Sequence, residues 1–146
     1  MAIRRIDHIG LVAASWEEAK AIWVPRMGFA VSEWKGVGDA GVYFAPERTM
    51  NYFIDVGEGE TVLEVIVPQD AESGAGKFLA KRGPGLHHIG YAVDDVPGEA
   101  ERLRAEGLRQ VDLGPGAGAA FFYPRDVQGV LTELVPYQAP HVRVHR

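Results

Sequence analysis

Two histidines and two glutamates occupy equivalent places in an internal repeat of this sequence. The repeat consists of two pairs of matching phrases: IDHIGLV (6–12) with LHHIGYAV (86–93), and TVLEVIVP (61–68) with VLTELVP (130–136). Alignment of the shared Ile-Gly places His8 on His88, and alignment of the second pair places Glu64 on Glu133. If the two modules pack about a pseudo-twofold axis, these four side chains meet at one point. Two imidazoles and two carboxylates at one point are ligands for a divalent metal ion.

The surroundings of Glu64 favour a metal ligand but leave a structural role open. Side chains alternate between the faces of a strand, so Glu64 shares a face with Val62 and Ile66, while Leu63 and Val65 pack against helices. A carboxylate among apolar strand residues is costly unless it is paired or bound to a metal. Taken alone, this glutamate also fits an edge-strand charge or an ion pair. The second glutamate at the equivalent point of the repeat favours the metal site.

The histidines have the same two interpretations. A lone histidine in such a phrase is more often a core residue with satisfied hydrogen bonds than a ligand, and the repeat favours the ligand. Adjacent strand residues point to opposite faces, so an inward His88 makes His87 its outward neighbour. Asp7 and His87 either support the site from outside or have no role in it.

The overall composition excludes several classes of function. The chain has 146 residues, a formal net charge of −5 and no cysteine. The negative charge gives no electrostatic footprint for nucleic acid. Without cysteine there are no disulfides or thiolate ligands, so a metal must be held by nitrogen and oxygen. We expect neither a signal peptide nor a membrane span, and therefore a cytoplasmic protein.

The strand and helix signals occur in the same order in each half. Strands are expected at 6–13, 29–34, 41–45, 50–56, 61–67, 86–93, 108–113, 118–123 and 129–135. Ser15 and Glu18 form a capping box for a helix from Trp16 to Met27, which Pro25 should end early or kink. Further helices are expected at 76–83 and from Asp94-Asp95 to Gly107. The extra residues of the first half, 36–50, are expected to cover one side of a cleft.

These phrases resemble the vicinal oxygen chelate superfamily, which includes glyoxalase I and methylmalonyl-CoA epimerase. Residues 77–96 (KFLAKRGPGLHHIGYAVDDV) and 121–136 (FFYPRDVQGVLTELVP) are most similar to the epimerases. The resemblance implies an α+β fold in which two tandem βαβββ modules, residues 1–74 and 75–146, share one curled eight-stranded mixed sheet around a metal cleft. It implies a homodimer and one divalent ion, which the ligand types leave open as cobalt, manganese, nickel or zinc. The ligand positions that match are His8, Glu64, His88 and Glu133.

The same resemblance implies an isomerase that removes and returns a proton α to a carbonyl through a metal-stabilised enolate, with an acyl-CoA or another α-acidic carbonyl compound as substrate. Two acid/base groups must then face the planar enolate. In epimerases they are glutamates: the C-terminal ligand, here Glu133, and one on the third strand of the first module. Asn51 or Tyr52 stands at that second position. Glu47 and Asp55 either substitute for the missing glutamate or have surface roles.

Two further features near the cleft have alternative interpretations. Tyr123 stands where epimerases often carry histidine, and is either catalytic or a packed aromatic. Lys77, Lys81 and Arg82 either meet the phosphates of CoA or form a solvated basic face.

Two other functions use the same fold. A glyoxalase-type lyase would use these ligands on the hemithioacetal of a thiol. A binding protein of the antibiotic-resistance kind would sequester a small molecule without turnover. Such binding proteins commonly lack a full ligand set, so four intact ligand candidates favour an enzyme.

Overall fold

The two strands that carry the matching histidine phrases, β1 (Ile3–Val12) and β6 (Gly85–Val93), lie antiparallel at the centre of one mixed sheet. The computed structural model describes residues 3–138. The other strands are β2 (Ala30–Val31), β3 (Val42–Phe44), β4 (Thr49–Asp55), β5 (Val62–Pro68), β7 (Ala120–Phe122) and β8 (Thr132–Pro136). The α-helices are α1 (Trp16–Ala21), α2 (Gly74–Arg82) and α3 (Val96–Ala105).

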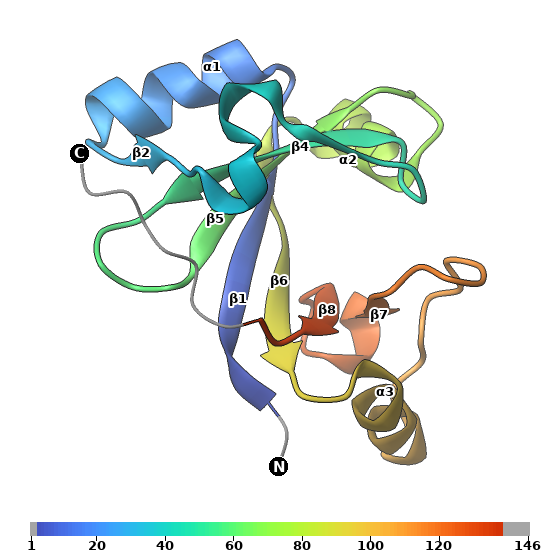
Figure 1. Cartoon of the computed structure of the whole chain (residues 1–146). Coiled ribbons are helices and arrows are strands. Elements are labelled where there is room, and N and C mark those ends of the chain that lie inside the picture. The colour runs from blue at the N-terminus through green and yellow to red at the C-terminus, as the bar shows by residue number, and fades with distance from the viewer. Residues whose placement is uncertain (1–2, 139–146) are drawn as a thin grey trace.

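The sheet confirms the expected fold class. Its eight strands follow the order β2-β4-β5-β1-β6-β8-β7, with β3 also paired to β4, and it does not close into a barrel. β5 runs parallel to β1 and antiparallel to β4, while β8 runs parallel to β6 and antiparallel to β7. The two halves therefore repeat one pairing pattern on either side of the β1–β6 junction (Figure 1).

The second and third expected strands of the first half occupy one position in the sheet. Ala30 of β2 lies opposite Asp55, and Val42 of β3 lies opposite Asn51, so both strands pair with the same edge of β4. The residues between them form two short 3₁₀ turns, Trp34–Gly36 and Gly38–Ala40. This interruption reduces the expected strand 29–34 to two residues and preserves the βαβββ order.

The prediction of a strand at 108–113 is wrong. The only ladder pairing of this segment among the described residues is a single bridge from Gln110 to Phe122. The chain then enters a run in which three glycines have positive φ (Gly114, Gly116 and Gly118) and Pro115 has no N–H. Left-handed backbone and a missing donor prevent a ladder from continuing.

The first helix begins and ends as the sequence indicates, but its interior changes type. The Ser15 side chain accepts a hydrogen bond from the Glu18 N–H at 3.1 Å, and Gly28 follows the last turn with φ of 82°. The α-helical part ends at Ala21 and a π-helical segment continues to Arg26. Pro25 lies inside that segment, where its missing N–H and its ring oppose regular α-helical hydrogen bonding.

Both later helices begin at a side-chain cap, and the cap of α3 is at the predicted position. The Asp95 side chain caps α3 by accepting from the Gly98 N–H, with Pro97 in the first turn. α2 starts two residues earlier than expected because Ser73 caps it by accepting from the Gly76 N–H at 3.0 Å.

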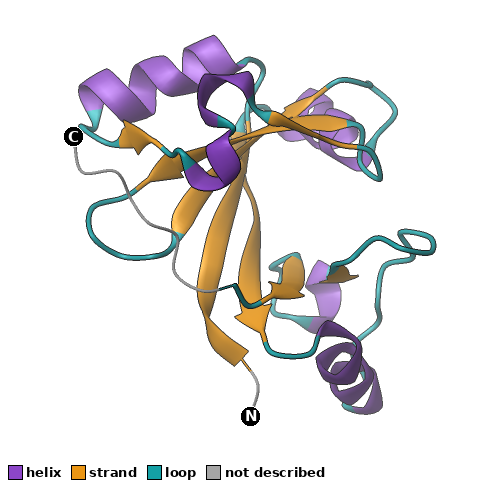
Figure 2. Cartoon of the chain, in the orientation of Figure 1, coloured by secondary structure: helices purple, strands orange, loops and turns teal. Residues whose placement is uncertain are grey.

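Separate helices cover one face of the sheet in each half, as Figure 2 shows for α1 and α3. Leu63 and Val65 pack with Trp16 of α1 in the first core. In the second core Leu134 and Phe122 pack with Ala100 of α3. The alternation of side chains then turns the opposite face of β5, including Glu64, toward the inside of the curled sheet.

No helix in the described range 3–138 is long and apolar enough to cross a membrane.

Truncation of Ile54 tests the first core. Ile54 is fully buried between the sheet and α1, so Ile54→Ala should lower the free energy of unfolding by about 2–5 kcal/mol through lost burial and a residual cavity. Urea denaturation measures the change. Ile22→Ala, at a side chain that is 46% exposed, is the control and should cost far less. Equal losses in both variants would contradict the assigned core.

Candidate metal centre

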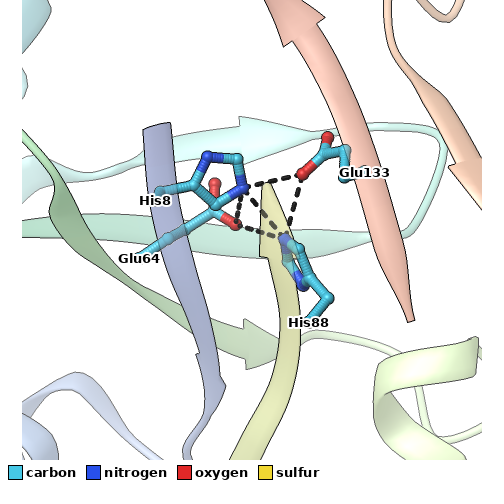
Figure 3. Close-up of side chains that lie close together, drawn as sticks. All are labelled: His8, Glu64, His88 and Glu133. Carbon is cyan, nitrogen blue, oxygen red and sulfur yellow. Dashed lines mark hydrogen bonds and ion pairs between the residues drawn. The ribbon is translucent and has the colours of Figure 1, made fainter. Parts of the chain in front are cut away.

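Four side chains from four strands converge at the centre of the inner face. His8 of β1, Glu64 of β5, His88 of β6 and Glu133 of β8 each offer one ligand atom, and these atoms all lie within 4.8 Å of one another (Figure 3). The two imidazole Nε2 atoms are 3.0 Å apart. Oε1 of Glu133 lies 2.7 Å from His8 Nε2 and 3.0 Å from His88 Nε2. Oε1 of Glu64 lies 3.7 Å and 3.5 Å from the same two nitrogens.

This geometry fits the ligand shell of a divalent ion. Nitrogen and oxygen atoms about 2.1 Å from one ion are separated by roughly 3.0 Å at right angles and roughly 3.4 Å in a tetrahedron. His8, His88 and Glu133 are buried, with at most 7% of their surface exposed. A cation at their centre would compensate the cost of burying two carboxylates.

Two glycines make this convergence possible. Gly90 lies opposite His8 across the β1–β6 ladder, and Gly10 lies opposite His88. A Cβ on Gly90 would lie 2.1 Å from Cε1 of His8, and a Cβ on Gly10 would lie 2.2 Å from Cε1 of His88. Each imidazole therefore lies directly on the backbone of the opposite strand, where only glycine leaves room for it.

A carboxylate holds the outer nitrogen of His8. Asp7 Oδ2 lies 2.8 Å from His8 Nδ1, and both side chains are buried. Arg5 lies on the outer side of Asp7, with its Nη2 3.8 Å from Asp7 Oδ1, and also pairs with Glu60. A carboxylate on the outer nitrogen favours Nδ1–H and leaves Nε2 free for a metal.

A second histidine holds the outer nitrogen of His88. The Nδ1 atoms of His87 and His88 lie 2.9 Å apart. Burial and the neighbouring His88 lower the pKa of His87 to about 4, against the opposite effect of Glu133. His87 is therefore neutral at neutral pH.

The register of β4 decides which residue faces Glu64. Asn51 points to the inner face and its Nδ2 lies 3.4 Å from Glu64 Oε2, while Thr49 donates its hydroxyl hydrogen to Asn51 Oδ1 at 2.7 Å. Tyr52 points to the other face, where it stacks on Trp16. An amide that contacts Glu64 thus occupies the position where the resemblance leads one to expect a glutamate.

Charge is distributed unequally between the two carboxylates. Burial raises the pKa of Glu64 above its ordinary value, although the imidazoles of His8 and His88 act to lower it. Burial also opposes ionisation of Glu133, but hydrogen bonds from His8 and His88 lower its pKa to about 2. Burial opposes the charged form of His8, yet the Glu64 carboxylate and the Asp7 hydrogen bond raise the pKa of His8 well above 6.5.

Three of the four side chains, Glu64, His88 and Glu133, line a cleft of about 500 Å³, and His8 completes the cluster beside them. The lining of the cleft includes Glu47, which is half-buried. Burial raises the pKa of Glu47, although the nearby Arg48 acts to lower it. Tyr123 is 45% exposed, and neither it nor Asp55 belongs to the lining. The segment 36–50 contributes Phe44, Glu47 and Thr49 to one wall.

The first part of that segment covers a helix instead of the cleft. Asp39 Oδ1 accepts hydrogen bonds from Trp16 Nε1 at 3.0 Å and Lys20 Nζ at 2.8 Å. The expected cover over the cleft is therefore confined to the residues from Phe44 onward.

Sequence reasoning missed the role of Gly10 and Gly90. Their signal was present, because each follows its histidine by two residues in both copies of the repeat. Their function became visible only with the pairing of β1 and β6, which places each glycine under the opposite imidazole.

Comparisons with known proteins define the class. The model of the glyoxalase/bleomycin resistance protein/dioxygenase superfamily matches residues 7–123. The chain belongs to this superfamily.

Relatives within the class include CoA-ester epimerases. An ethylmalonyl-CoA/methylmalonyl-CoA epimerase of Cereibacter sphaeroides is 30% identical, over 90% of this chain and 97% of that protein. The uncharacterized protein YqjC of Bacillus subtilis is 31% identical, over 90% of this chain and 91% of that protein. A variant methylmalonyl-CoA epimerase of Streptomyces coelicolor, in complex with 2-nitronate-propionyl-CoA, superposes with a TM-score of 0.78 at 29% identity, covering 94% of this chain and 100% of that one.

A methyl group on Gly90 tests the packing of the imidazole. Gly90→Ala should displace His8 and weaken binding of Co²⁺ or Zn²⁺ by at least about tenfold, since a misplaced ligand lowers metal affinity. Competition with a chromogenic chelator measures the affinity. Gly85→Ala in the same strand is the control, because a Cβ there would meet no other part of the chain within 4 Å. Unchanged affinity in Gly90→Ala would contradict the packing.

The protonation of His8 predicts how metal affinity depends on pH. Below its raised pKa, His8 carries a proton that a metal ion must displace, and above that pKa it does not. Affinity should therefore fall by about tenfold per pH unit once the pH is below the pKa of His8. Calorimetry between pH 6 and pH 8, in buffers of different ionisation enthalpy, measures affinity and proton release together. A constant affinity without proton release would contradict the assignment.

Proposed function

We propose that this protein is a divalent-metal-dependent epimerase of α-substituted acyl-CoA thioesters, of the methylmalonyl-CoA epimerase kind. The observation that carries the proposal is the orientation of the two carboxylate oxygens of Glu133. Glu133 contributes Oε1 to the cluster of imidazole nitrogens, while its second oxygen points away from them in Figure 3. A carboxylate held in this way can bind a cation with one oxygen and accept a proton with the other.

The electrostatics of Glu133 leave its carboxylate free of a proton. Its lowered pKa keeps it ionised at neutral pH. Its position between two imidazoles, on a strand that is paired on both sides at Glu133, fixes the direction in which it accepts a proton. A divalent ion held by His8, Glu64, His88 and Glu133 would stabilise the negative charge that develops on the thioester oxygen.

Glu47 is the proposed second acid/base group. Inversion at the α carbon requires that a proton leave one face and return to the other, so the reaction needs a group besides Glu133. Glu47 is the remaining carboxyl group in the lining of the cleft, apart from the two candidate ligands. Burial raises its pKa, which favours the protonated form that returns a proton.

The rim of the cleft suits the carrier end of the substrate. Lys77, Lys81 and Arg82 of α2 line the same cavity as three of the candidate ligands, Glu64, His88 and Glu133. Phe44 and Leu86 contribute apolar surface to it. A thioester at the ligands and phosphates at these cations would place the two ends of an acyl-CoA in one cavity.

Exchange of the α hydrogen tests the function. Protein stripped of metal and reloaded with Co²⁺ or Mn²⁺ should incorporate deuterium at the α carbon of methylmalonyl-CoA, as followed by NMR. Glu133→Gln should lower the rate by at least about 100-fold, the usual contribution of a general base. Because Glu133 is also a candidate ligand, the variant is assayed at saturating metal and its metal content is measured.

The hemithioacetal of methylglyoxal and glutathione is the comparison substrate. If the protein turned over the hemithioacetal but did not exchange the α hydrogen of methylmalonyl-CoA, the proposed function would be wrong and the protein would be a glyoxalase-type lyase. If the protein bound a metal ion tightly but catalysed neither reaction, a non-catalytic binding protein would be the better interpretation.

Assays on each epimer of methylmalonyl-CoA separately test the role of Glu47 as the second acid/base group. Glu47→Gln should still exchange the α hydrogen of the epimer whose proton faces Glu133, while inversion of either epimer falls by about 100-fold or more. Chiral analysis of the product alongside deuterium content distinguishes exchange from inversion. Asp55→Asn is the matched control and should invert normally. Normal inversion in Glu47→Gln with loss in Asp55→Asn would transfer the role to Asp55.

A further inference from the structure

The two imidazole ligands have different outer partners at equivalent points of the repeat. Asp7 precedes His8 and contacts its Nδ1, while His87 precedes His88 and contacts its Nδ1. Asp7 is buried and has Arg5 on its outer side. His87 is only partly buried and lines the cleft. The partner of one ligand is thus enclosed by the protein, and the partner of the other faces the space where a substrate would bind.

The positions of the hydrogens on the histidine pair follow from the contact itself. Two Nδ1 atoms at 2.9 Å form a hydrogen bond only if one carries a hydrogen and the other does not. If His88 binds a metal through Nε2, that nitrogen has no hydrogen and the neutral ring carries its hydrogen on Nδ1. His88 is then the donor and His87 Nδ1 the acceptor. A neutral His87 that accepts through Nδ1 must carry its own hydrogen on Nε2.

The Nε2–H of His87 is available to a ligand. Among the residues that the structure describes, no hydrogen bond engages this nitrogen. The ring is held on one side by His88 and on another by Phe78 of α2, whose ring centroid lies 5.2 Å away at a steep interplanar angle of 77°. Phe78 and Leu86 line the cleft beside it. The imidazole is therefore fixed in orientation while it remains in contact with the cavity.

We propose that His87 has two linked roles: it positions the metal ligand His88, and it donates a hydrogen bond from Nε2 to an oxygen of the bound acyl substrate. The inference rests on the metal site and the acyl-CoA substrate proposed above. The oxygen is a carboxylate or carbonyl oxygen, because the neutral Nε2–H donates and does not accept. Metal binding and substrate binding are linked through one ring, since the hydrogen on His88 Nδ1 determines the tautomer of His87.

Two substitutions separate the two roles. In His87→Asn, the amide oxygen lies where Nδ1 was, so it still accepts from His88, but the Nε2–H is lost. In His87→Leu, both the acceptor and the donor are lost. Asp7→Asn is the matched control, because it changes the outer partner of His8 at a point that does not line the cleft.

The first measurement is metal binding, by chelator competition and by the visible spectrum of the Co²⁺ protein. His87→Leu and Asp7→Asn should each lower the affinity for Co²⁺ by about 10–100-fold and alter the spectrum of the bound ion. The affinity of His87→Asn for Co²⁺ should stay within about threefold of that of the parent protein. An unchanged Co²⁺ affinity and spectrum in His87→Leu would overturn the positioning role. Circular dichroism confirms that the variants are folded.

The second measurement is calorimetric binding of an equimolar mixture of methylmalonyl-CoA epimers to the metal-saturated proteins, which undergoes no net reaction. Both His87 variants should weaken this binding by about tenfold, the effect of one lost hydrogen bond, and by more than Asp7→Asn does, which perturbs the metal site but keeps the donor. Unchanged binding in His87→Asn, or no binding to the parent protein, would overturn the donor role. The metal measurement needs no turnover, so a protein that fails to exchange α hydrogens but shows the expected metal effects refutes the proposed function without refuting the positioning role.

Discussion

The antiparallel pairing of β1 with β6 is the constraint on which the rest of the site depends. Its register places Ile9 opposite Ile89 and each candidate histidine opposite a glycine. A shift of one residue would turn every side chain of one strand to the other face of the sheet. The two imidazoles would then separate, and bulkier residues would replace the glycines beneath them. Because both strands are central, this register is held by neighbours on each side.

Each half of the chain supplies one imidazole and one carboxylate, so neither half contains a complete site. The glutamates come from β5 and β8, which run parallel to the histidine strands of their own halves. The helices α1 and α3 pack on the opposite face and leave the inner face to the ligands. Folding of both halves and their pairing are therefore required before a metal ion meets four ligands, which couples metal binding to the whole sheet.

The sequence predicted the convergence of the four candidate ligands better than it predicted their surroundings, for a physical reason. A strand alternates with a period of two, so a repeated phrase places Glu64 and Glu133 on corresponding faces without knowledge of distant contacts. The choice between Asn51 and Tyr52 depended on the register of β4 against β5, which no local pattern fixes. The interruption between β2 and β3 and the single bridge at Gln110 likewise depend on where the chain leaves the ladder.

The near-symmetric ligand set is embedded in surroundings that are not symmetric. Asp7 and His87 differ at equivalent positions, and Asn51 contacts Glu64 whereas Glu133 has one oxygen directed away from the cluster. The proposed inversion of one carbon needs a group that transfers protons on each of its two faces, so it depends on Glu47 as well as on Glu133. The repeat thus explains how the four side chains converge, while the departures from the repeat distinguish the surroundings of the two carboxylates. In the proposed mechanism Glu64, which contacts an amide, would serve only as a ligand. Glu133, with its lowered pKa and an oxygen directed away from the cluster, would also accept the proton.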